Sequence, residues 1–143
     1  MIGLEKLLTE LLSGIAQYKP NTKEIYTKNK YGIPITVEIL DANTEAYIVR
    51  NYYDNGQLEY RFKYLNGKEH GTWKSWDENG KLWFQEEYRN GKSHGTWKVW
   101  HENGKLLYQN EYQNGKLHGT RKAWDKNGQL WHHKEYKNGK PIE

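Results

Sequence analysis

Histidine and glutamate side chains that could do chemistry recur in this sequence every 24 residues. They are His70, His94 and His118, and Glu87, Glu111 and Glu135. Imidazoles ligate zinc, and paired carboxylates can hydrolyse glycosides. If each repeat adds two strands to a sheet, equivalent side chains stand about 9.5 Å apart. Neighbouring histidines are then too far apart to share a zinc ion with bonds of about 2 Å. We therefore predict no metal site.

The glutamate spacing overlaps the wider carboxylate separation of glycosidases, but that match follows from the repeat itself. The sequence also contains no nucleophile elbow, phosphate-binding loop or nucleotide fingerprint. We predict a protein that is not an enzyme and needs no cofactor, in which each His-Gly pair shapes a turn. Because the chain has no cysteine, it lacks disulfides and thiolate metal sites, which is typical of a reducing compartment. The prediction is a cytoplasmic protein, in a host cytoplasm or a virion if its source is viral.

A repeat of 24 residues organises most of the chain. Residues 77–100 closely resemble residues 101–124 and 53–76. Asn-Gly pairs run through the repeats, with glycines at Gly56, Gly67, Gly80, Gly91, Gly104, Gly115, Gly128 and Gly139. Asn-Gly between short apolar runs is a strong hairpin signal because both residues tolerate positive φ. The pattern predicts an all-β repeat array, an elongated single antiparallel meander with one hairpin per repeat.

Within the repeats, glycine, histidine and tryptophan follow one motif. It is clearest in the run Tyr88-x-Asn90-Gly91-Lys92-x-His94-Gly95-x-Trp97-x-x-Trp100. This motif resembles the MORN repeat variant of many bacterial and giant-virus proteins, and the resemblance covers residues 51–140. It implies an elongated, non-catalytic hairpin array used for interaction. Some bacterial relatives are labelled antitoxin components, and the name MORN refers to membrane occupation and recognition.

The amino-terminal part differs from the array. Residues 3–17 place leucines and an isoleucine on one side at helical spacing, which predicts a short amphipathic helix that ends before Pro20. Acidic residues inside this segment argue against a secretion signal, and no apolar run is long enough to span a membrane. We predict three regions. They are the helix and connector at 1–28, a degenerate capping repeat with a strand at 35–40 within 29–50, and the MORN-variant array at 51–143.

The two faces of the predicted sheet differ in composition. If Trp76 lies opposite Leu82, alternation places these two residues on one apolar face with Phe84, Tyr88 and their repeats. We expect that face to be covered. The opposite, mixed face would present the predicted binding residues Trp73, Trp83, Trp97, Arg121 and Trp131.

A helix of about 14 residues is about 21 Å long and cannot cover four repeats. Either the sheet twists so that its aromatic side chains pack on each other, or part of the apolar face meets a protein partner or a second copy of the chain. The net charge of +4 is modest and both signs are interspersed, so we expect no nucleic acid and at most weak contact with a membrane surface. The predicted function is a protein–protein interaction or scaffold module. The alternatives are a carbohydrate- or lipid-headgroup-binding module that uses exposed tryptophan, and an antitoxin-like neutralising partner.

Overall fold

A single antiparallel sheet contains every strand of the molecule that the structure describes. The computed structural model describes residues 24–28, 32, 34–41 and 43–143. Strands adjacent in sequence are adjacent in space, and only the short β5 lies off this path, paired with β4. The strands are β1 (Glu24–Lys28), β2 (Pro34–Asp41), β3 (Ala46–Tyr52), β4 (Leu58–Leu65), β5 (Lys68–Glu69), β6 (Gly71–Trp76), β7 (Leu82–Arg89), β8 (Lys92–Trp100), β9 (Leu106–Gln113), β10 (Lys116–Trp124), β11 (Leu130–Lys137) and β12 (Lys140–Pro141).

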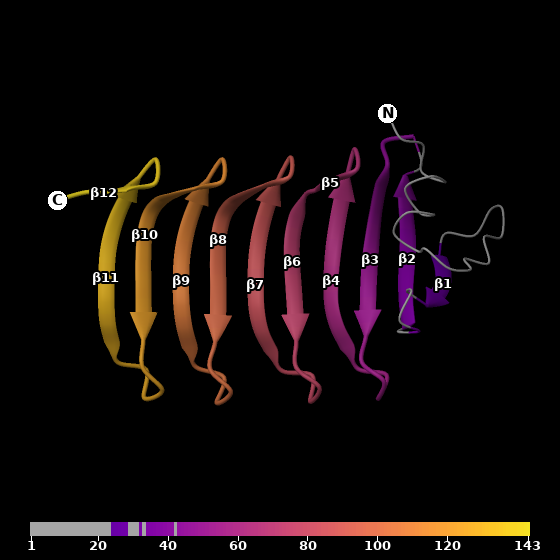
Figure 1. Ribbon diagram of the computed structural model, residues 1–143, viewed down its shortest axis with the longest axis horizontal. Helices are drawn as coiled ribbons and strands as arrows, with labels where there is room; N and C mark the ends of the chain where they lie inside the picture. Colours follow the sequence, from indigo (N-terminus) through magenta and orange to yellow (C-terminus); the bar gives the residue numbers. More distant parts are fainter. Residues whose placement is uncertain (1–23, 29–31, 33, 42) are drawn as a thin grey trace.

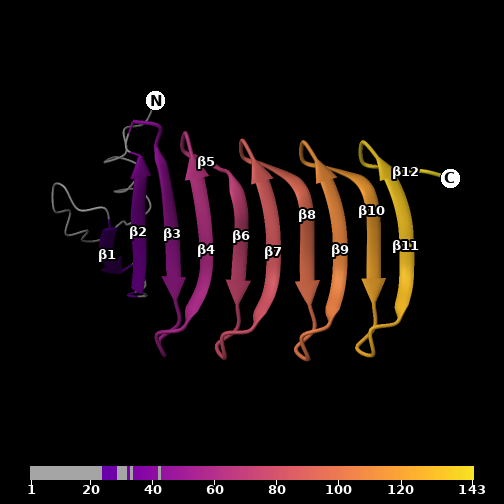
Figure 2. The ribbon, with the colours of Figure 1, turned by 180° about the vertical axis from the view of Figure 1, so that it is seen from behind.

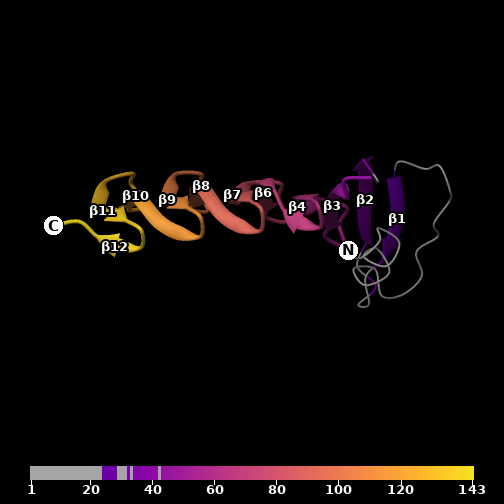
Figure 3. The ribbon, with the colours of Figure 1, turned by 90° about the horizontal axis from the view of Figure 1, so that it is seen from above.

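The strands lie side by side in chain order (Figures 1 and 2). Seen from above, β4 to β11 form one thin layer (Figure 3). The predicted all-β meander is therefore confirmed, as is the predicted strand at 35–40, which lies in β2. The predicted amphipathic helix at 3–17 lies outside the described residues. Among the residues that are described, no helix could cross a membrane.

The Asn-Gly pairs form two kinds of turn, one at each edge of the sheet. At the upper edge in Figure 1, both residues of a pair have positive φ, as at Asn90 (φ 50°) and Gly91 (φ 76°). Two successive residues with positive φ match the twist of a two-residue hairpin. At the lower edge only the glycine has positive φ, and the Gly80 N–H donates to the carbonyl of Asp77 at 2.9 Å. We call these longer loops, residues 53–57, 77–81, 101–105 and 125–129, the lower turns.

Two irregularities in each repeat decide which side chains share a face. Ser75 pairs with Phe84 but Trp76 pairs with Leu82, so one extra residue lies on the β7 side of this bulge. At the His-Gly position, Glu86 pairs with Trp97 while Tyr88 pairs with Ser93, so β8 gains two residues. Because side chains alternate with period two, the one-residue bulge reverses the alternation and the two-residue insertion preserves it.

The predicted assignment of side chains to the two faces of the sheet is wrong, because it did not include the one-residue bulge. Trp73 lies on the same face as Phe62 and Phe84, with ring centroids 4.1 and 5.5 Å away. Trp97 continues the row between Phe84 and Tyr108, at 6.2 and 6.5 Å. We call the side of the sheet that carries these five rings the aromatic face.

Large rings on the aromatic face cover the small side chains between them. Ser75, Asn110 and Ala123 retain only 7%, 3% and 1% of their exposure, although the described array is one layer thick. The best-buried apolar cluster lies near the amino-terminal end, where Val37 and Tyr47 are fully buried. The array is thus stabilised by side chains packed along one face.

Candidate functional site

The five predicted binding residues divide between the two faces. Trp73 and Trp97 belong to the aromatic row, and Arg121 joins them because it pairs with Asn110, which in turn pairs with Trp97. Trp83 and Trp131 lie on the opposite face and are 45% and 63% exposed. The structure therefore does not bring the five together, and only the second pair offers broad tryptophan surface to solvent.

The recurring glutamates have a structural task at the His-Gly insertions. The Thr96 N–H donates to Glu87 Oε2 at 2.9 Å, and Thr120 donates to Glu111 Oε2 through its N–H at 2.5 Å and its hydroxyl at 2.8 Å. The backbone N–H of Thr120 lowers the pKa of Glu111, which favours the ionised acceptor. These two carboxylates cap backbone N–H groups of the insertion.

The recurring histidines lie at the same insertions. His118 Nδ1 accepts from the Asn138 N–H at 3.4 Å, while Nδ1 of His70 and of His94 is buried and has no hydrogen-bond partner among the described residues. In the part of the chain that the structure describes, no three His, Cys, Asp or Glu side chains lie close enough to hold a metal ion together.

Side chains join each lower turn to the next. Asn55 Nδ2 donates to the Glu78 carbonyl at 3.0 Å, and Asn103 Nδ2 donates to the Lys126 carbonyl at 2.8 Å. Between turns 77–81 and 101–105, Lys81 Nζ reaches the Glu102 carbonyl at 3.4 Å. The lower turns therefore form a continuous edge, with open space between neighbouring tips.

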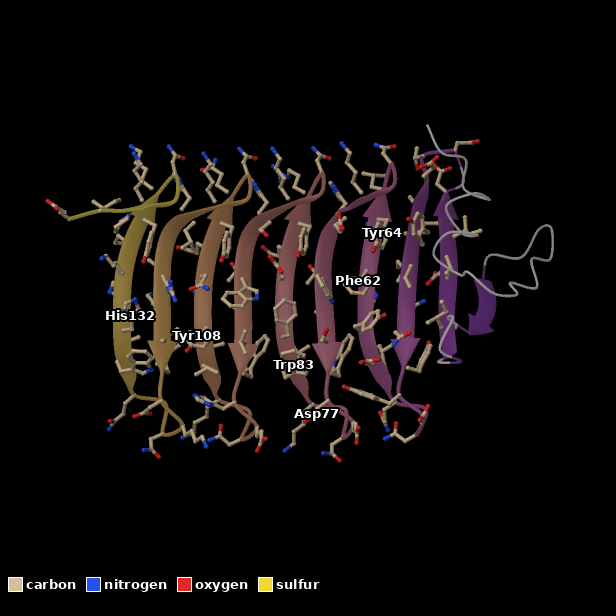
Figure 4. All side chains as sticks on the ribbon, viewed as in Figure 1. Phe62, Tyr64, Asp77, Trp83, Tyr108 and His132 are labelled. Atoms are coloured by element: carbon tan, nitrogen blue, oxygen red, sulfur yellow. The ribbon has the colours of Figure 1, made fainter. Side chains whose placement is uncertain are left out.

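An open groove of about 1170 Å³ lies where turns 77–81 and 101–105 face each other. Figure 4 shows Trp83 close to the turn that carries Asp77. The groove is lined by Tyr53, Asp77, Glu78, Asn79, Lys81, Leu82, Trp83, Trp100, His101, Glu102, Asn103 and Gly104. We call it the tip groove.

Trp83 and Trp100 form the apolar wall of the tip groove. β7 pairs with β8 so that Phe84 is opposite Val99 and Gln85 is opposite Lys98, and continuing this register brings Trp83 next to Trp100. Trp100 is therefore not on the face where the sequence analysis expected it. Sequence reasoning missed this pair because it placed the two residues on opposite faces.

A smaller groove follows at the next pair of lower turns. It has a volume of about 410 Å³ and is lined by Trp100, His101, Glu102, Asn103, Leu107 and Lys126. Leu107 stands at the repeat position of Trp83, and Lys126 at that of Glu102. The second groove shares Trp100, His101, Glu102 and Asn103 with the tip groove, but it has less aromatic surface and less negative charge.

The hairpin geometry agrees with the comparison against protein families. The model of the MORN repeat variant matches residues 48–68, 69–90, 93–114 and 117–138, four consecutive repeats that span most of the chain. The chain belongs to the MORN repeat variant family. Its MORN repeats follow the strand pairs β3–β4, β6–β7, β8–β9 and β10–β11 closely. No curated protein sequence matches the chain.

A comparison with solved structures gives two matches to this MORN array. A mutant of TarM from S. aureus, crystallised with fondaparinux, alpha-GlcNAc-glycerol and UDP, is 16% identical with a TM-score of 0.53, over 80% of this chain and 23% of that one. A GtfA/B complex is 12% identical with a TM-score of 0.40, over 92% of this chain and 24% of that one. The chain thus spans about a quarter of each of those proteins. The likeness to TarM is one of fold alone.

Proposed function

We propose that this MORN-repeat chain is a non-catalytic protein–protein interaction or scaffold module that binds its partner at the tip groove. The observation that carries the proposal is the exposed Trp83 beside Trp100 in an open groove. Centrally placed tryptophans are among the residues that most often dominate interface energetics. Repeat arrays also present such sites on a continuous surface without a deep core.

The recurring polar residues support a non-catalytic role. Glu87 and Glu111 are occupied in capping Thr96 and Thr120, and the histidines lie within the turn structure. We propose the cytoplasm as the compartment, because a chain without cysteine suits reducing conditions.

A carbohydrate-binding module is the second candidate. Its support is the same tryptophan pair, now with the amide of Asn79 in the groove lining, since aromatic rings stack on sugar rings while amides bind hydroxyl groups. The row of Trp73 and Trp97 no longer supports it, because those rings pack against their neighbours.

Affinity capture with mass spectrometry tests the proposed function, in parallel with a glycan array. The lysate comes from the organism that encodes the chain, and the bait is the full chain or its Trp83→Ala variant. We expect the variant to lose its specific protein partner while its thermal midpoint stays within a few degrees of the parent. Trp131→Ala is the matched control, because Trp131 is also exposed but lies away from the groove.

Capture that survives Trp83→Ala would refute the tip groove as the binding surface. Binding to a glycan that depends on Trp83, with no protein captured, would favour the second candidate.

A further inference from the structure

The tip groove is acidic although the protein as a whole is basic. Its lining includes the carboxylates of Asp77, Glu78 and Glu102 against the single ammonium group of Lys81, while the chain carries a net charge of +4. Asp77 Oδ1 already accepts the backbone N–H groups of Asn79 and Lys81, each at 2.9 Å. Its carboxylate is thus partly committed to shaping the turn.

Glu78 and Glu102 are exposed and available for a ligand. Neither belongs to an ion pair with another residue of the described structure. Lys81 contacts the backbone carbonyl of Glu102, so its ammonium group is directed at the peptide group and leaves both carboxylates unpaired. An incoming cation would therefore meet two acceptors beside the tryptophan wall.

We propose that the tip groove binds an arginine side chain from an exposed segment of the partner protein. This inference rests on the proposed function and names the chemistry of its partner. A guanidinium group is planar, weakly hydrated and always charged, so it can stack on an aromatic ring while its edge donates to carboxylates. Trp83 and Trp100 supply the rings, and Glu78 and Glu102 supply the acceptors.

The neighbouring groove shows that the repeat alone does not produce this combination. At the equivalent positions it has Leu107 in place of Trp83 and Lys126 in place of Glu102, so it lacks the second ring and carries an opposing charge. The same fold thus provides an internal comparison. Arginine recognition should belong to the tip groove and be absent from the second groove.

Nuclear magnetic resonance of the ¹⁵N-labelled full chain tests the proposal, with the indole N–H signals of its tryptophans as reporters. The probe is the capped tripeptide acetyl-Gly-Arg-Gly-amide, and the control probe replaces arginine by the neutral isostere citrulline. We expect the arginine peptide to shift the signals of Trp83 and Trp100 saturably while that of Trp131 stays in place. The citrulline peptide should bind roughly tenfold more weakly or worse, because it cannot form the charged hydrogen bonds.

Two variants test which residues bind the arginine peptide. Glu78→Gln with Glu102→Gln keeps the size of both side chains and removes their charge, so affinity for the arginine peptide should fall roughly tenfold. Leu107→Trp with Lys126→Glu copies the tip groove into the second groove, and the indole signal introduced there should then shift with the peptide. A dispersed amide spectrum like that of the parent verifies that both variants are folded.

Equal shifts from the arginine and citrulline peptides would overturn the proposal, as would undiminished affinity after both glutamates are neutralised. Shifts caused by chitobiose but not by the arginine peptide would also overturn it, and would point to a sugar site. The same experiments distinguish failure of this inference from failure of the proposed function. If protein capture still depends on Trp83 while the arginine peptide does not bind, the interaction surface stands and the chemistry of its partner is different.

Discussion

The His-Gly insertion offers a sharp test of how the repeat is stabilised. Gly119 has a φ of +104°, and a Cβ added there would lie 3.1 Å from both Cβ and Cδ of Glu111. An alanine would therefore suffer backbone strain of about 1–2 kcal/mol. It would also displace the carboxylate that caps Thr120, and a hydrogen bond to a charged group contributes about 1.5–3 kcal/mol. We expect Gly119→Ala to lower the free energy of unfolding by about 2.5–5 kcal/mol, the sum of the two effects.

A second glycine separates the two causes. Gly104 also has positive φ, +82°, but nothing lies within 4 Å of a Cβ built on it. Gly104→Ala should therefore cost only the strain, about 1–2 kcal/mol. Urea unfolding followed by tryptophan fluorescence measures both values, and equal slopes with denaturant are required for the comparison.

A double-mutant cycle completes the test. Glu111→Ala removes the carboxylate that Gly119→Ala would displace, but it keeps a Cβ 3.1 Å from the added methyl group. In that background Gly119→Ala should therefore cost less than in the parent and still more than Gly104→Ala. The reasoning is refuted if Gly119→Ala is no more destabilising than Gly104→Ala, or if its cost is unchanged in the Glu111→Ala background.

The remaining predictions concern the aromatic row and pH. Trp73→Ala should lower the free energy of unfolding by about 3–5 kcal/mol, as deletion of a packed large aromatic does, whereas exposed Trp131→Ala should cost less than about 1 kcal/mol in the same urea assay. Similar losses for both would mean that Trp73 is not part of the packed row. Because the folded state lowers the pKa of Glu111, its contribution is fully present above the pKa of the unfolded state and is lost as pH falls through the folded value. Glu111→Gln should therefore be less stable than the parent at pH 7, and the gap should narrow on acidification in urea titrations at a series of pH values; a constant gap would contradict this.

The turns of this fold could be predicted from the sequence because their determinants are local. Asn-Gly pairs tolerate the positive φ that tight turns need, and the structure has that backbone at Asn90 and Gly91 as at their repeats. Strand order follows directly, since each hairpin leaves no room for a crossover.

The faces could not be predicted by the same means. A single extra residue between the pairs Ser75–Phe84 and Trp76–Leu82 reverses the alternation, and nothing in the local composition marks it. At His-Gly, by contrast, the insertion is of two residues and leaves the alternation intact. The same error affects the predicted binding site. Sequence alternation predicts opposite faces for Trp83 and Trp100, whereas both line the tip groove in the structure.

The joining of one lower turn to the next has a kinetic consequence. The hydroxyl of Tyr53 donates a hydrogen bond to the carbonyl of Trp76, and these two residues are 23 positions apart in the sequence. Each strand of the array also pairs only with its neighbours in the sheet. Most all-β proteins fold slowly because they must close long loops before distant strands meet. In this array, each new contact closes a loop of about one repeat, however many repeats follow. The entropic cost of closing that loop therefore does not grow along the chain. Each hairpin can add to the one before it while the polypeptide is still emerging from the ribosome, and the folding time should depend little on the number of repeats.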